Sequence, residues 1–597
     1  MPRKYELLPR SIDSLLGWVK SGELAIPEIQ RPFVWDTTQV RNLLDSLFQD
    51  YPVGYLITWK SPDVNLKDGT RSEGKKILID GQQRITALMA ALLGYEVVTK
   101  DYRRIRIRIA FNPQQRKFEV LNTAIEKDPA WIPDISVLFA PEYENLPFLL
   151  AYCEKNPGTT PNELDKSISA LLKIVNNPIG IIELDSALDI ETVTDIFIRV
   201  NSAGVALSQA DFAMSKIAVN ETHGGPDLRR AIDYFCHLAV APDYYSTIER
   251  NDKAFAATEY FHKMAWLRKE NDDLYDPSYN DMLRVAFTSQ FGRGRLQDLV
   301  ALLSGRNFET RQYEESVVED TFRRLREGVY SFMNETHFKR FIMIIRSAGF
   351  IDASLIGSQM TLNFAYILYL VLRGQDVPDA DIERQVRRWF VIAQLTGRYS
   401  GSAETAIDED MKQIATHGIA AYAEMTLRGQ LGEAYWETVL PQNLETSSIS
   451  SPYFNVFLAA QVKLNDRGFL SRDITVRELI EYKSDVHHVF PRDLLKKAGA
   501  TRGQYNQIAN YVVAQSEINI AISNKEPGVY FKQVIEQTCG GPLKYGNIAD
   551  PAELRENLTM NCIPEGVEQM TVADYPAFLL ARRKLMAQRI KTYFQGL

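Results

Sequence analysis

The chain has few cysteines and histidines and no long apolar run. It contains four cysteines and seven histidines in 597 residues. The cysteines lie far apart with no CxxC pair, which argues against a disulfide framework and a structural zinc ribbon. The longest apolar stretch, residues 364–372, is too short to span a bilayer, and residues 1–16 lack the apolar core of a signal peptide. The sequence therefore predicts a cytoplasmic protein without a membrane segment.

The chain is also long and slightly acidic. Its 597 residues and mass of 68.0 kDa exceed what one hydrophobic core supports, so roughly three or four domains are expected. The formal net charge of −8 argues against binding of polyanions by the whole surface. A nucleic acid would therefore bind at a focused basic groove.

The N-terminal third has the pattern of an α/β domain. Residues 53–60, 75–80 and 179–184 are typical of strands, and residues 38–50 and 84–95 carry apolar residues at helical spacing. A capping-box pair, Ser208 and Asp211, predicts a helix that continues into the 210s. This part of the chain should therefore contain a small sheet covered by helices.

The rest of the chain is mainly helical until about residue 450 and mixed thereafter. Residues 225–440 have helical periodicity, and residues 577–594 are typical of a basic helix. Arginines and aromatics in residues 387–402 could contact DNA or simply belong to a packed helix. The predicted fold class is α+β, multidomain and predominantly helical, with domains at 1–222, 223–445 and 446–597.

Two adjacent histidines in "SDVHHVFPRDLL", residues 484–495, are the clearest catalytic signal. Adjacent side chains of a strand point to opposite faces, so both can serve one site only where the strand breaks, and Pro491 marks such a break. Asn510 follows His488 by 22 residues, and Asn519 follows nine residues later. Hydrolysis of a phosphodiester needs a base for water and a cation for the phosphate, and a neutral imidazole can supply the base.

This order of residues resembles the HNH, or ββα-metal, endonuclease motif over residues 485–527. The resemblance implies His487 as a metal ligand, His488 as general base, Asn510 as the residue that orients the base, and Asn519 as a second ligand. Asp485 and Lys525 fall within the motif and are assigned to the metal shell and to catalysis. Such donors suit Mg²⁺ or Mn²⁺ better than a closed zinc site. The alternative is that both histidines cap a strand and hydrogen-bond internally.

A second dense segment is "ILIDGQQRITAL", residues 77–88, where a strand runs through a glycine turn into a helix. Backbone N–H groups at a helix N-terminus attract anions, and Arg84 adds a bidentate phosphate donor. Asp80 could carry a metal, contact a base or ribose, or cap the helix. The alternative is an aspartate N-cap paired with arginine, without any ligand.

Residues 26–57, the DGQQR motif at 80–84 and residues 196–212 together resemble the N-terminal ParB-like domain of GmrSD-type proteins, and the HNH region resembles the C-terminal nuclease domain of that family. The resemblance implies a type IV, modification-dependent restriction enzyme in phage defence that binds and hydrolyses a nucleoside triphosphate and cuts double-stranded DNA. The nucleotide could be GTP, UTP or ATP. The nucleotide-site candidates are Asp80, Gly81, Gln82, Gln83, Arg84 and Thr86, with Gln30 and Arg31 as neighbours.

Two other function classes stay open on the sequence alone. One is a non-catalytic ParB-like DNA-binding regulator, and the other is a nuclease toxin without a modification sensor. Metal-dependent nicking would separate an enzyme from a regulator. The sequence does not fix which DNA modification is recognised, and a homodimer, which would ease double-strand cleavage, is a further open alternative.

Overall fold

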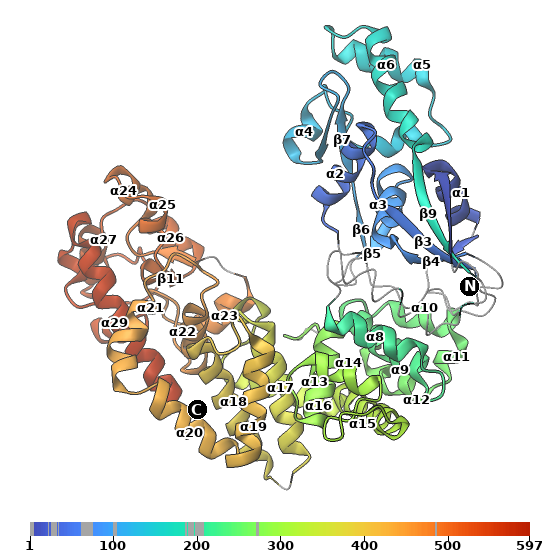
Figure 1. Cartoon of the computed structure of the whole chain (residues 1–597). Coiled ribbons are helices and arrows are strands. Elements are labelled where there is room, and N and C mark those ends of the chain that lie inside the picture. The colour runs from blue at the N-terminus through green and yellow to red at the C-terminus, as the bar shows by residue number, and fades with distance from the viewer. Residues whose placement is uncertain are drawn as a thin grey trace. The chain divides into compact units, whose positions relative to one another are not determined.

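The structure is a computed structural model that describes the chain except for residues 1–4, 22, 26–32, 34, 61–75, 99–103, 186–187, 189–195, 197–207, 270–273, 376 and 484–485. It is predominantly helical with small sheets, as the sequence predicts (Figure 1). Two compact units divide the chain: unit 1 is Met1–Glu270, Ser278–Asn280 and Leu299–Phe322, and unit 2 is Asn271–Pro277, Asp281–Asp298 and Arg323–Leu597. The predicted three-domain division stays a prediction. Among the residues described, no helix combines the length and apolar character needed to cross a membrane.

Unit 1 contains a five-stranded sheet. Its order is β1-β9-β3-β4-β2, formed by β1 (Tyr5–Ser11), β2 (Leu24–Ala25), β3 (Tyr55–Lys60), β4 (Lys76–Asp80) and β9 (Pro178–Leu184). The pairs β1/β9 and β3/β4 are antiparallel, whereas β3/β9 and β2/β4 are parallel. The three strands that the sequence predicts are thus confirmed, and they lie next to one another in the sheet.

Helices cover one face of this sheet. They are α1 (Ile12–Ser21), α2 (Thr37–Phe48) and α3 (Gln82–Leu92), and their buried residues share a core with Leu56 and Leu78. Because side chains alternate along a strand, Ile57 and Ile79 point to the other face, where they join a smaller apolar cluster. The sheet is therefore buried on both sides near the end of β4.

Smaller elements complete unit 1. Two hairpins pair β5 (Glu96–Val98) with β6 (Arg104–Arg106) and β7 (Ile109–Asn112) with β8 (Lys117–Val120). Helices follow in the order α4 (Thr123–Lys127), α5 (Asn145–Lys155), α6 (Pro161–Leu172), α8 (Gln209–Val219), α9 (Gly225–Val240), α10 (Tyr244–Asn251), α11 (Lys253–Ala256) and α12 (Glu259–Lys263). The Ser208 and Asp211 capping box at the start of α8 is confirmed, with reciprocal backbone contacts of 2.9 and 3.2 Å.

The helical part of unit 2 is built around α17 (Gln359–Arg373) and α18 (Asp379–Thr396), with α16 (Glu335–Ser347), α19 (Ala403–His417), α20 (Ile419–Gln430) and α22 (Pro452–Lys463) around them. Trp389 is buried and its indole nitrogen donates to Tyr399 Oη at 2.9 Å. Arg398 Nε lies 2.8 and 2.9 Å from the carboxylate oxygens of buried Asp410. These side chains of the 387–402 stretch therefore belong to a packed helix and its following turn.

The C-terminal part of unit 2 holds two short antiparallel strands, β10 (Val486–His488) and β11 (Tyr511–Val513). Helices α24 (Arg492–Lys497) and α25 (Arg502–Tyr505) lie between the strands in sequence, and α26 (Ser516–Ile522) follows β11. Further along come α27 (Pro527–Thr538), α28 (Pro551–Met560) and α29 (Tyr575–Gln595), which confirms the basic C-terminal helix. The order strand, strand, helix thus surrounds the adjacent histidines.

Two candidate functional sites

The DGQQR segment of unit 1 is a sharp turn between β4 and α3. Asp80 ends the strand, Gly81 has φ of 95°, and α3 begins at Gln82. A Cβ atom at Gly81 would lie 2.1 Å from Leu56 Cδ2 and 3.5 Å from Leu56 Cα. Both the left-handed backbone and the close approach of β3 therefore require glycine.

Asp80 and Arg84 form the ion pair that the alternative interpretation expects. Arg84 Nη2 lies 3.6 Å from Asp80 Oδ2, and Arg84 Nη1 donates a hydrogen bond to the carbonyl oxygen of Tyr55. The N-cap of α3, however, is Gly81 without a side-chain cap, so Asp80 does not cap the helix. Both charged side chains stay about one-fifth exposed, at 23% and 21%. A pair of this kind adds little stability and leaves the guanidinium accessible.

Gln82 carries a buried acceptor that has no partner in the part of the chain that the structure describes. Its side chain is 6% exposed, and among the residues described no donor reaches its Oε1 atom. A buried polar atom of this kind costs about 1–3 kcal/mol in the free protein, and a bound molecule with a suitably placed donor would recover that cost. The oxygen therefore fits a base or ribose donor, whereas the start of α3 and Arg84 fit a phosphate.

The remaining predicted nucleotide residues divide between those seen and those outside the described residues. Gln83 is buried and Thr86 is half-buried, both on α3 with Gln82 and Arg84. Gln30 and Arg31 lie outside the residues that the structure describes. The structure therefore brings the contiguous motif together, while the two neighbours stay predictions.

In unit 2, the β10/β11 ladder sets the two histidines. His487 pairs with Val512 and His488 pairs with Tyr511, and the strand ends at His488. Pro491 then caps α24, so the break that its position predicts is present. Val489 N donates to Asn510 O at 2.8 Å and continues the pairing one step beyond the strand.

Asn510 is fully buried and joins the two loops that flank His488. Its Oδ1 accepts from Phe490 N at 2.8 Å, and its Nδ2 donates to Phe490 O at 3.0 Å and to Tyr505 O at 3.3 Å. These bonds hold the backbone just after the histidines against the segment just before β11. The predicted role of Asn510 in orienting the base stays a prediction, and its observed contacts are with backbone.

His488 has a side-chain partner that the sequence analysis missed. Its Nε2 lies 3.1 Å from Asn506 Oδ1, and the Tyr511 ring meets its imidazole edge-on at a centroid distance of 5.0 Å. Burial lowers the pKa of His488; the Asn506 hydrogen bond opposes this effect, and Arg492 and His487 add to it. The imidazole is therefore neutral at pH 7 and able to accept a proton. Asn506 lies four residues before Asn510, where no spacing rule points to it.

The other predicted HNH residues lie on α26 and beyond it. Asn519 is half-buried on α26. Lys525 donates from its ammonium group to the carbonyl oxygen of Ala521 near the end of α26, and its Nζ lies 5.3 Å from the centroid of the Tyr545 ring. In the described part of the chain no three His, Cys, Asp or Glu side chains gather into a metal site, and Asp485 lies outside that part.

The predicted donor set has the chemistry of a hard cation site. His487 offers one imidazole and Asn519 one amide oxygen, which leaves most positions around a cation to oxygens of water or phosphate. The charged side chains that flank β10 in sequence are mainly basic: Lys483, Arg492, Lys496, Lys497 and Arg502. Asp493 lies 3.6 Å from Arg492 Nε and 3.8 Å from Lys496 Nζ and offsets part of this charge. The surroundings of β10 therefore suit a phosphate backbone.

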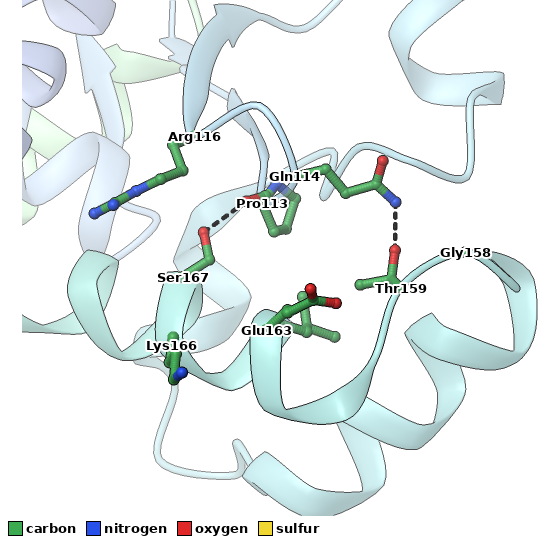
Figure 2. Close-up of a pocket in the computed structure, with 9 residues that line it drawn as sticks. Pro113, Gln114, Arg116, Gly158, Thr159, Glu163, Lys166 and Ser167 are labelled. Atoms are coloured by element: carbon green, nitrogen blue, oxygen red, sulfur yellow. Dashed lines mark hydrogen bonds between the residues drawn. The ribbon is translucent and has the colours of Figure 1, made fainter.

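A pocket of about 460 Å³ in unit 1 lies apart from the DGQQR segment in sequence (Figure 2). The turn between β7 and β8 and the start of α6 form its walls. Ser167 Oγ donates to Pro113 O at 2.7 Å, and Gln114 Nε2 donates to Thr159 Oγ1. Glu163 belongs to the capping box of α6. These polar groups already make hydrogen bonds within the protein, and none of them is a predicted site residue.

Comparison with known proteins finds a family match for the N-terminal part of the chain. Residues 12–218, which include the DGQQR segment, match the family model of the GmrSD restriction endonuclease, N-terminal domain. Over 577 residues the chain is 23% identical to the uncharacterized protein MJ0686 of Methanocaldococcus jannaschii, and the alignment covers 89% of this chain and 88% of that protein. This part of the chain is therefore similar to the N-terminal domain of GmrSD restriction endonucleases. The HNH-like segment lies outside the matched range.

Proposed function

We propose that this protein is a modification-dependent, type IV DNA endonuclease in phage defence, with an HNH site in unit 2 and a nucleoside triphosphate site at DGQQR in unit 1. The nuclease part rests on the strand–strand–helix segment that contains a neutral, half-buried His488. Buried Asn510 hydrogen-bonds the backbone that follows this histidine. The match of residues 12–218 to a restriction endonuclease domain supports the biological role.

In the nuclease reaction, His488 takes a proton from the attacking water. Asn510 keeps the loop after His488 in place, and basic side chains around β10 bind the DNA backbone. His487, Asn519 and Asp485 would hold Mg²⁺ or Mn²⁺, and Lys525 is assigned to the same site. The cation would neutralise charge on the phosphate and the leaving oxygen.

At the DGQQR site, Gly81 lets the chain turn into α3 and Arg84 binds phosphate oxygens. Gln82 Oε1 accepts a hydrogen bond from the base or ribose. Asp80, Gln83 and Thr86 complete the site, and Gln30 and Arg31, which lie outside the described residues, are assigned to it from the sequence. Hydrolysis of GTP, UTP or ATP there regulates the nuclease.

The test is cleavage of paired phage DNAs, one with glucosylated hydroxymethylcytosine and one unmodified. Reactions contain Mg²⁺ or Mn²⁺, with and without each nucleoside triphosphate, and His488→Ala serves as control. We expect cutting of the modified DNA only, dependent on nucleotide and lost in the variant. Equal cutting of both DNAs would favour a toxin without a modification sensor. Absence of cutting on DNAs that carry different modifications, with retained DNA binding, would favour a ParB-like regulator.

A further inference from the structure

The only side-chain oxygen within hydrogen-bond distance of His488 in the described part of the chain is that of Asn506, at 3.1 Å from Nε2. A carbonyl oxygen accepts and cannot donate, so Nε2 must carry the hydrogen in this contact. A neutral imidazole has one N–H, and its other nitrogen is then an acceptor. The contact therefore selects the tautomer of His488 in which Nδ1 has the free lone pair.

Asn506 is presented by a turn whose backbone is fixed on both sides. Its own N–H donates to Arg502 O at 3.2 Å, and the side chain of Gln507 donates to Gly503 O at 2.7 Å. Tyr575 Oη of α29 donates to Gln504 O at 2.9 Å. Because the turn is held by bonds that do not involve Asn506's side chain, its amide is free to serve the histidine.

The rest of the ring's surroundings fix its plane. Tyr511, directly across the ladder, contacts the imidazole at an interplanar angle of 89°. Tyr530 Oη donates to Val489 O at 2.9 Å, which anchors the residue after His488. With the ring plane set by Tyr511 and the backbone set by Tyr530 and Asn510, a single hydrogen bond decides which nitrogen is protonated.

We propose that Asn506 is a positioning residue for the nuclease reaction, which holds His488 in the Nε2–H tautomer so that Nδ1 receives the proton of the attacking water. This inference rests on the proposed nuclease function. In the step, the water proton moves to Nδ1, the water oxygen bonds to phosphorus, the bond from phosphorus to the leaving oxygen breaks, and that oxygen takes a proton from solvent.

Three variants of the full chain test the role. Asn506→Leu keeps the size but removes the acceptor, Asn506→Asp keeps an acceptor, and Asn547→Leu changes an exposed asparagine of the same unit as a matched control. With metal and DNA, we expect kcat to fall about 10- to 100-fold in Asn506→Leu while KM for DNA changes less than about twofold. Asn506→Asp should recover kcat to within about threefold of wild type. Equal kcat in wild type and Asn506→Leu would overturn the proposal.

A spectroscopic measurement decides the tautomer without any activity. In protein labelled with ¹⁵N-histidine, the His488 signals are identified by their loss in His488→Ala. We expect wild type to show a protonated Nε2 and an unprotonated Nδ1, and Asn506→Leu to show a mixture of the two tautomers. A protonated Nδ1 in wild type would mean that the Asn506 amide donates, and the proposal would fail even if Asn506→Leu unfolds. Full cleavage by His488→Ala would instead remove the proposed function while leaving the tautomer result in place.

Discussion

The two candidate sites differ in how they use their buried amide groups. In unit 2, the side chain of Asn510 makes three hydrogen bonds to backbone atoms, and these bonds hold the loop after His488 in place. In unit 1, Gln82 Oε1 is buried and has no donor among the residues described. The first amide stabilises the fold, whereas the second lowers the stability of the free protein and is suited to a ligand. The proposed nuclease site is therefore held in place by the protein's own hydrogen bonds, whereas the proposed nucleotide site keeps a buried acceptor for a ligand.

The largest expected effect is that of Asn510→Ala in unit 2. The change leaves the N–H and C=O of Phe490 without their partner, so the free energy of unfolding should fall by roughly 2–4 kcal/mol, and cleavage should be lost. Urea unfolding followed in the full chain measures the first effect. Asn547→Ala, a change at an exposed position, is the control. Equal stability of the two variants would contradict a stabilising role of the Asn510 hydrogen bonds.

A second prediction concerns Asp466, which is buried beside Arg589. Burial raises the pKa of Asp466 to about 6, and Arg589 opposes this shift. The folded protein binds this proton more tightly than the unfolded chain does. The aspartate's contribution to stability is therefore present below about pH 4 and is lost as the pH rises through 6, by roughly 3 kcal/mol. Asp466→Asn does not titrate there, so its stability relative to wild type should rise by that amount from pH 4 to 7. A constant difference over this range would contradict the assignment.

A third prediction tests the charged group at the DGQQR site. Arg84→Ala removes the proposed phosphate donor, and we expect nucleoside triphosphate affinity to fall at least about tenfold. Loss of the Asp80 pair alone should change stability by less than about 1 kcal/mol, since both side chains are partly exposed. Nucleotide titration of the full chain measures affinity, and the exposed Arg116→Ala is the matched control. Unchanged affinity in Arg84→Ala would place the nucleotide elsewhere.

The smallest expected effect is an increase in the free energy of unfolding, caused by Gln82→Leu. Gln82→Leu replaces the amide, whose oxygen has no donor among the described residues, with an apolar group of similar size. The free protein should therefore be stabilised by about 1 kcal/mol while nucleotide affinity falls. Thermal unfolding with and without nucleotide measures both quantities, with exposed Gln49→Leu as control. A variant that is destabilised without nucleotide would show that Gln82 is a structural residue.

The sequence predicted several local elements correctly. Strands β3, β4 and β9 and the capping box at Ser208 follow from short-range periodicity and turn chemistry, and Pro491 marked the end of β10 correctly. The DGQQR turn is likewise contiguous, so its strand, glycine and helix could be recognised directly. Features that depend on residues adjacent in sequence could therefore be predicted.

Contacts between segments that are distant in sequence could not be predicted from it. Asn506 reaches His488 across 18 residues only because α24 and α25 fold back between the strands. Tyr530 and Tyr575, which anchor Val489 O and Gln504 O, come from α27 and α29 and carry no motif. Such contacts depend on tertiary packing, which periodicity does not report.

The most direct test of the central claim is nicking of a supercoiled plasmid carrying modified bases, measured for wild type and His488→Ala with Mg²⁺ or Mn²⁺. The exposed His417→Ala serves as the matched control. The account predicts metal-dependent nicking by wild type and His417→Ala, and a loss of at least about 100-fold in His488→Ala with an unchanged melting temperature. Undiminished nicking by a folded His488→Ala would show that the segment at β10 and β11 is not the nuclease site.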